Sequence, residues 1–182
     1  MSSIQLNNAT KSLIVSSLSK LMQTKSLDKI RVNDIIEDCQ ISRHTFYYHF
    51  DNIYNAAYWE FERILNETFP EEDRNESIEA SAVEMIDFFR TNRNLCKSMI
   101  ESKHHSQMEH IIYEKVENVI RNEYRKNNLP WAELSQEKKE LIVKVLAISE
   151  AACVKGWLLD QFKASSKDMI DVLMKMMKGL SL

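Results

Sequence analysis

The side chains best suited to specific recognition lie in one short stretch, residues 41–50, which reads Ile-Ser-Arg-His-Thr-Phe-Tyr-Tyr-His-Phe. On a helix that turns about 100° per residue, Phe46 and Phe50 fall on one side, whereas His44, Tyr47 and Tyr48 fall on the other. The second group donates and accepts hydrogen bonds and would be costly to bury unpaired. We therefore expect the phenylalanines to dock on a core and the polar side chains to face outward.

A second helix-length segment, residues 32–39, directly precedes this stretch. Its apolar residues recur at helical spacing: Val32, Ile35, Ile36 and Cys39. Little more than Gln40 and Ile41 separates it from Ser42, a favourable N-cap residue. Two short helices joined by a tight turn, the second presenting polar side chains, form a helix-turn-helix layout.

The run from Thr10 to Phe61 resembles the DNA-binding domain of the TetR family of bacterial transcriptional regulators, whose pattern ends in Ser-x-x-Thr-x-Tyr-x-His-Phe. Here the pattern stands as Ser42, Thr45, Tyr47, His49 and Phe50. An aromatic core helix that never meets DNA is the alternative interpretation of the same residues. The resemblance and the outward face together predict the following DNA-binding residues: Arg31, Ser42, Arg43, His44, Thr45, Tyr47, Tyr48 and His49.

Arg31, Gln40 and Ile53 bear on how this region would contact DNA. In the resembling family the residue at Arg31 begins the second helix and commonly touches the DNA backbone, although a lone surface Arg is also common. The family usually has Gly where Gln40 stands, so Gln40 must adopt a conformation that Gly takes more cheaply, or the turn differs. It usually has Lys where Ile53 stands, and Ile53 removes a phosphate contact.

Composition and charge fit an all-α protein with a locally basic N-terminal part. The 182 residues include only two Gly and two Pro, which leaves little material for β-turns. The net charge is −3, but residues 1–50 carry six Lys or Arg against four acids, a net of +2, so the remainder carries −5. No apolar run reaches the roughly 20 residues of a membrane span and no secretion signal stands at the start, so we expect a cytoplasmic location.

The sequence offers little support for metal binding or catalysis. Glu101, His105 and Glu109 share a helical face, but such residues more often form solvated pairs, so no metal and no cofactor are expected. No Gly-rich phosphate loop or Ser/His/Asp set stands out, and no Gly occurs before Gly156, so we expect no enzyme. The three widely spaced cysteines, Cys39, Cys96 and Cys153, are interpreted as packing residues.

Helical periodicity continues through the chain and predicts about nine helices, as the resemblance also implies. The clearest segments are residues 10–25, 32–39, 42–50, 52–68 with Asn52 as cap, 136–162 with Ser135 as cap, and 166–178 with Ser165 and Asp168 in capping-box spacing. Residues 69–76 form an acidic break, and residues 127–131 a loop. We expect a helix-turn-helix domain over residues 1–51 and a larger helical domain for effector binding and dimerisation over residues 52–182.

The last two helices are apolar on more than one side. Nearly every residue from Leu141 to Val154 is apolar, and the final helix is similar. A terminal helix pair of this kind is hard to cover within one protomer, so it predicts a symmetric four-helix dimer interface; an internal hairpin is the alternative. The predicted interface residues are Leu141, Val145, Ile148, Ala152, Ile170, Leu173 and Met177.

Large apolar and sulfur-containing side chains on separate predicted helices are suited to a core and to a ligand pocket alike. The resemblance implies an effector site in this part of the chain. The candidate pocket residues are Trp59, Phe61, Met85, Phe89, Cys96, Met99, Tyr113, Cys153 and Trp157. Gly156-Trp157-Leu158-Leu159, followed by Phe162 and Ser165, also resembles a Firmicute-type subgroup that includes dihydroxyacetone-kinase regulators.

Together with these observations, the resemblance implies a homodimeric TetR-like regulator, a repressor released from double-stranded operator DNA by a small-molecule effector. Two alternatives stay open. One is an activator that acts with a partner protein, and the other is a dimeric ligand sensor that no longer binds DNA, which Gln40 and Ile53 would favour.

Overall fold

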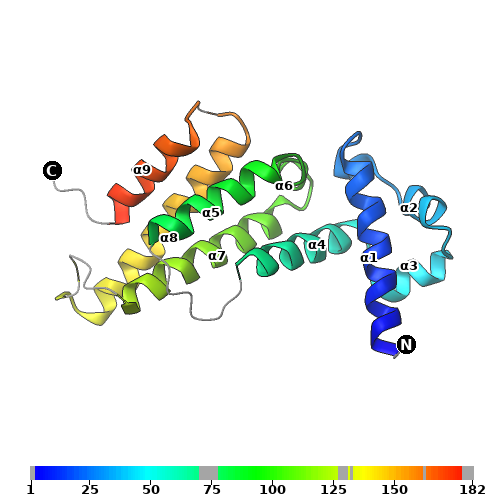
Figure 1. The fold of residues 1–182 in the computed structure, drawn as a ribbon, viewed down its shortest axis with the longest axis horizontal. Helices are drawn as coiled ribbons and strands as arrows, with labels where there is room; N and C mark the ends of the chain where they lie inside the picture. The colour runs from blue at the N-terminus through cyan, green and yellow to red at the C-terminus, as the bar shows by residue number, and fades with distance from the viewer. Residues whose placement is uncertain (1–2, 70–77, 127–130, 132, 162, 178–182) are drawn as a thin grey trace. The chain divides into compact units, whose positions relative to one another are not determined.

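The periodic apolar segments form helices throughout the computed structural model, which describes residues 3–69, 78–126, 131, 133–161 and 163–177 (Figure 1). Within these ranges the chain forms nine α-helices, one 3-10 turn and no strand. The all-α prediction is confirmed. The elements are α1 (Ser3–Met22), η1 (Leu27–Lys29), α2 (Val32–Cys39), α3 (Arg43–His49), α4 (Ile53–Thr68), α5 (Ile78–Thr91), α6 (Arg93–Ile100), α7 (His105–Lys126), α8 (Gln136–Leu158) and α9 (Ser166–Met177).

The predicted and observed helix ends agree best where a side chain caps the helix. Asn52 accepts a hydrogen bond from the Asn55 N–H at 2.9 Å and begins α4 as expected. At α9, the Ser165 hydroxyl accepts from the Asp168 N–H at 3.1 Å while the Asp168 carboxylate accepts from the Ser165 N–H at 3.3 Å, a reciprocal capping box. α1, which we expected over residues 10–25, instead begins at Ser3 and ends at Met22.

The predicted end of α8 at residue 162 was too late, because the helix stops at Leu158. Asp160 takes a left-handed conformation with φ 57°, which no α-helix can continue through. The side chain of Arg93 donates to the carbonyls of Trp157 at 3.0 Å and Leu158 at 3.2 Å and pairs with Asp160 at 2.6 Å. These bonds satisfy helix-end carbonyls that have no partner within α8.

The chain divides into two compact units. Unit 1 comprises Met1–Glu71 and Asn94–Met108, and unit 2 comprises Glu72–Arg93 and Glu109–Leu182. This division differs from the boundary expected at residue 51, because α4 and α6 pack with the N-terminal helices. The functional division into a DNA-binding and an effector domain stays a prediction.

In unit 1, α1 packs against α2, α3 and α4, and its buried face supplies much of the core. The largest fully buried side chains there are Ile14, Leu18, Leu27, Ile35, Phe46, Tyr58, Phe61, Met99 and Met108. A second set of contacts ties α6 and the following turn to the same unit. The Leu27 N–H donates to the Ser98 hydroxyl at 3.1 Å, and the Tyr58 hydroxyl donates to the His104 carbonyl.

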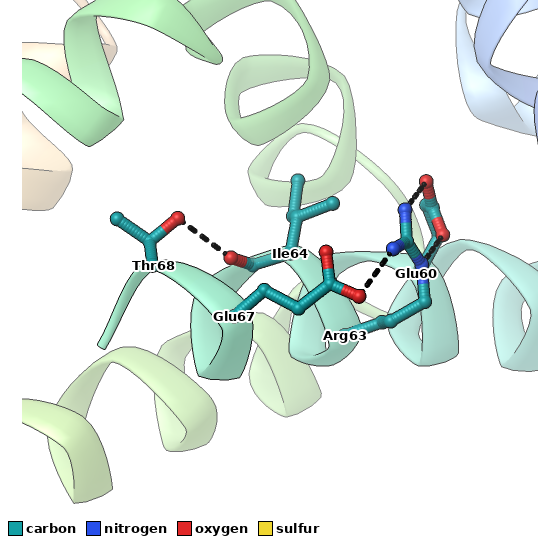
Figure 2. A network of polar contacts seen from close by, with 5 residues as sticks. All are labelled: Glu60, Arg63, Ile64, Glu67 and Thr68. Carbon is teal, nitrogen blue, oxygen red and sulfur yellow. Dashed lines mark hydrogen bonds and ion pairs between the residues drawn. The ribbon is translucent and has the colours of Figure 1, made fainter. Parts of the chain in front are cut away.

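The outward side of α4 carries a linear ion-pair network, shown in Figure 2. Arg63 donates to Glu60 at 2.7 and 2.9 Å and to Glu67 at 2.7 Å, so one guanidinium links two turns of the helix. The Thr68 hydroxyl donates to the Ile64 carbonyl at 2.8 Å one turn later. Pairs of this spacing contribute a few tenths of a kcal/mol each and favour a continuous helix.

Unit 2 is a helical bundle in which α9 packs against α5 and α8. The inner side of α8 is buried through Val143, Leu146, Ala147, Glu150, Val154, Gly156, Trp157 and Leu158. None of the helices in the described ranges is long and apolar enough to cross a membrane.

Candidate nucleic-acid interface and ligand cavity

The turn between α2 and α3 has helix-turn-helix geometry. Gln40 ends α2 with φ 54° and ψ 40°, a left-handed conformation that Gly takes more cheaply and thus the first of the two alternatives considered for this position. The Ile41 N–H donates to the Ile36 carbonyl at 3.1 Å. The Ser42 hydroxyl then accepts from the Thr45 N–H at 3.0 Å and caps α3. A bulky residue in this conformation costs about 1 kcal/mol relative to Gly, and the turn keeps its geometry despite that cost.

α3 has one buried side and one exposed side, as the sequence predicts. Phe46 is 0% exposed and Phe50 is also buried, and their rings lie 6.3 Å apart. Tyr48 is 71% exposed, and Tyr47 and His44 are exposed as well. The helix therefore presents a hydroxyl-bearing and imidazole-bearing face, which is suited to hydrogen bonding with base edges and phosphates.

The two predicted arginines lie at the surface beside this face, and each is tied to α2. The Arg43 guanidinium donates to the Asn33 side-chain oxygen at 2.5 Å, which orients it between α3 and α2. Arg31 directly precedes α2, where its backbone N–H donates to the Asp34 carboxylate at 2.8 Å. Asn33 was missed at the sequence level, because nothing in its local pattern indicates that it meets Arg43.

Two of the predicted DNA-binding residues are only partly accessible. Thr45 is half-buried, and its hydroxyl lies 2.8 Å from that of Ser42. His49 is also half-buried, and burial, followed by the nearby charge of Lys11, lowers its pKa below the ordinary histidine value. At neutral pH its imidazole is therefore a hydrogen-bonding group with little positive charge.

Lys11 and Ile53 take part in the packing of unit 1. The Lys11 ammonium lies 5.2 Å from the centre of the Trp59 ring and 5.6 Å from that of Phe50. Ile53, which replaces the family's lysine, is buried at the start of α4. Ile53 thus contributes apolar packing to unit 1 where a Lys would offer a charge.

The exposed side of α8 forms an apolar stripe in unit 2. Leu141 is 62% exposed, Val145 52% and Ile148 59%, and Ala152 is exposed one turn later. Their spacing of four, three and four residues places them on one helical face. Of the other predicted interface residues, Ile170 is half-buried, Leu173 is buried within the protomer, and the side chain of Met177 lies outside the described residues.

Unit 2 also contains a cavity between four helices. The empty space enclosed by its lining residues, including the part open to solvent, is about 470 Å³. The lining residues are Ser81, Ala82, Met85 and Ile86 of α5, Val116 and Val119 of α7, Glu150 and Val154 of α8, and Leu173 and Met174 of α9.

Of the nine candidate pocket residues, Met85 alone lines this cavity. Phe89, Tyr113, Cys153 and Trp157 lie elsewhere in unit 2, whereas Trp59, Phe61, Cys96 and Met99 belong to unit 1. Large side chains mostly fill cores, and Phe61, Phe89, Cys96 and Met99 are fully or almost fully buried.

Glu150 is the ionisable residue of the cavity, and it was not among the predicted pocket residues. It is 7% exposed, and its buried Oε1 has no hydrogen-bond partner among the described residues. Burial raises its pKa to about 7. The available signal was a single acid within the apolar run from Leu141 to Val154, where an ionisable group is costly unless it is used.

The residues considered for a metal site make ordinary polar contacts within the protein. Glu109 pairs with Lys155 at 2.5 Å, and the His105 ring Nδ1 lies 3.2 Å from the Ser102 carbonyl oxygen. Within the described ranges no group of three or more His, Cys, Asp and Glu residues is arranged to hold a metal ion. Cys96 is buried and its pKa is raised to about 12, so it is an inert packing residue.

Comparison with known proteins agrees with this architecture. A family model of the TetR class, described as "Transcriptional regulator C-terminal region", matches residues 76–179. No curated protein sequence matches the chain.

Two of the solved structures that match the chain illustrate the shared fold. One is titled "Dihydroxyacetone kinase operon activator DhaS", with a TM-score of 0.71, 19% identity, and coverage of 93% of this chain and 96% of that one. The other is a TetR transcriptional regulator from Streptococcus agalactiae, with a TM-score of 0.70, 18% identity, and coverage of 95% and 96%. With the family model spanning more than half of its residues, the chain belongs to the TetR family of transcriptional regulators.

Proposed function

We propose that the protein is a homodimeric repressor that binds operator DNA through α2 and α3 and leaves it when a small molecule binds in unit 2. The observation that carries the DNA-binding part is the two-sided α3, with Phe46 in the core and Tyr48 and His44 at the surface. The protein would act in the cytoplasm, where its operator is accessible.

The division of labour along α3 follows from side-chain chemistry. His44 and Tyr48 lie on the exposed side and would read base edges in the major groove, whereas Tyr47 and His49 would contact phosphates. Arg43 and Arg31 would add charge-assisted phosphate contacts beside them. Because the hydrogen bond to Asn33 already orients the Arg43 side chain, Arg43 would lose less conformational entropy on binding a phosphate.

Dimerisation would come from the exposed stripe of α8. A row of aliphatic side chains such as Leu141, Val145 and Ile148 is unfavourable in water, and a second copy would cover it by a two-fold packing of α8 and α9. A dimer also suits the DNA, because two recognition helices must lie about 34 Å apart to enter successive major grooves. An effector that favours a different spacing would release the operator.

The DNA part is tested by fluorescence anisotropy with DNA that flanks the protein's own gene. His44→Ala and Tyr48→Ala should weaken binding to the specific sequence roughly 10-fold or more without lowering the melting temperature. His110→Ala is the matched control, since His110 is an exposed histidine on α7 paired only with Glu114 at 3.3 Å. Unchanged binding by both α3 variants would contradict the assignment.

The dimer is tested by light scattering on Ile148→Asp. A charge in the middle of the stripe should give folded monomers at micromolar concentration, because an unpaired buried charge costs several kcal/mol. Leu13→Asp is the control, an exposed apolar residue of α1 outside the stripe. A dimeric Ile148→Asp variant would place the interface elsewhere.

A second candidate function is activation of transcription with a partner protein. It is favoured by the fold shared with a protein titled an operon activator, at 19% identity. A reporter gene placed behind the bound DNA separates the two, since deletion of the regulator should raise expression under repression and lower it under activation. The third possible function is a dimer that binds ligand but no DNA. The anisotropy assay would identify it by an absence of DNA binding by the wild type.

A further inference from the structure

The cavity of unit 2 has an unusual combination of features: apolar walls and one carboxyl group without a partner. Met85, Val116, Val154 and Leu173 are typical of the walls, and Ser81 is the only other polar side chain among the lining residues. Glu150 is more than nine-tenths buried and its Oε1 accepts no hydrogen bond from any described residue. Buried carboxylates in proteins are ordinarily paired.

We propose that this cavity binds a small lipophilic amine, with the ammonium group paired to Glu150 and the apolar body packed against the aliphatic walls. The amine's role as effector rests on the proposed function above, whereas its binding does not.

The charge balance of the cavity selects a cation over other ligands. The lining residues from α5, α7 and α9 carry no charge. On α8, burial and the negative charge of Glu150 raise the pKa of the neighbouring Cys153 thiol. A purely apolar ligand would leave the carboxyl unpaired, and a carboxylate ligand would be repelled. An alcohol would supply one hydrogen bond without a charge, whereas an ammonium group supplies both.

The protonation state strengthens this selection. Burial raises the pKa of Glu150 to about 7, so an empty cavity holds a mixture of the acid and the carboxylate at neutral pH. Alkyl amines resemble the lysine side chain and stay protonated at that pH. Binding of the ammonium ion therefore favours the carboxylate and drives the carboxyl proton into the buffer.

The test is isothermal titration calorimetry of the full chain with three ligands of one shape: cyclohexylamine, cyclohexanol and cyclohexanecarboxylate. The amine should bind at least roughly ten-fold more tightly than the alcohol, and the carboxylate should not bind. Titrations in buffers of different ionisation heat should show release of about half a proton per amine at pH near 7. Equal affinity for amine and alcohol, or no proton release, would overturn the proposal.

Two variants assign the effect to one residue. Glu150→Gln keeps the shape of the side chain and should lose both the preference for the amine and the proton release. Glu137→Gln removes an exposed carboxylate from the first turn of the same helix and should retain both. If Glu150→Gln retained the amine preference, the binding site would lie elsewhere.

Operator binding is measured separately on the same preparations. Loss of amine selectivity with intact operator binding overturns the cavity assignment alone. Absence of operator binding with intact amine selectivity overturns the proposed function alone.

Discussion

Replacing Glu150 with Gln should stabilise the protein in a strongly pH-dependent way. The carboxyl is 7% exposed and its pKa rises from 4.5 to about 7 on folding. An acid with a raised pKa keeps its proton to a higher pH in the folded state. Between pH 4.5 and about 7 the folded chain therefore binds more protons than the unfolded chain. Stability is therefore lost as the pH rises from about 4.5 to about 7 and stays reduced above that.

The size of the effect follows from the same two values. Their difference, 4.5 subtracted from about 7, corresponds to about 3 kcal/mol of unfolding free energy at alkaline pH. Because Gln carries no charge at any pH, the stability advantage of Glu150→Gln over the wild type should grow by roughly 2.5 kcal/mol between about pH 5 and about pH 8. The packing cost of the amide adds an offset that does not change with pH.

Urea unfolding followed by circular dichroism measures this difference. Wild type, Glu150→Gln and the surface control Glu137→Gln are compared at both pH values and at one fixed protomer concentration, since the stability of the proposed dimer would depend on concentration. The control should follow the wild type. An advantage of Glu150→Gln that is the same at both pH values would refute the reasoning, because it would mean that the carboxyl is solvated or paired in the folded protein.

Three further substitutions test unit 1. Gln40→Gly should raise the unfolding free energy by about 1 kcal/mol, because Gly adopts the left-handed conformation at φ 54° without strain; a lower urea midpoint would contradict this. Phe46→Ala should cost roughly 3 to 5 kcal/mol through a cavity in the core and abolish DNA binding only by unfolding, which a melting curve beside the anisotropy assay distinguishes from a lost contact. Tyr58→Phe should cost about 1 kcal/mol, since it removes the hydroxyl that donates to the His104 carbonyl, and an unchanged urea midpoint would show that the bond adds no stability.

Helix positions and the orientation of α3 follow from local patterns and could therefore be predicted. Ser42 and Asn52 cap their helices with bonds to residues three positions later, so no distant part of the chain is needed to place them. The spacing of Phe46 and Phe50 against His44 and Tyr48 likewise determines which side of α3 can be buried. The end of α8 was misjudged because the stop depends on Asp160 and on Arg93, which comes from a distant part of the chain.

The tertiary structure, and not the helical periodicity, determines which neighbours each apolar side chain contacts. Periodicity indicates that α8 is apolar on two sides, but only packing shows that Val154 faces the cavity while Ile148 faces solvent. For the same reason Leu173, predicted at an interface, lines the cavity, and Met85 alone of the candidate pocket residues does so. The sequence by itself determined the all-α class, the helix-turn-helix and its exposed face, because these depend on neighbours within a few residues. The cavity, the unpaired state of Glu150 and the packing of Ser98 against Leu27 depend on contacts between residues far apart in the chain, which no local pattern specifies.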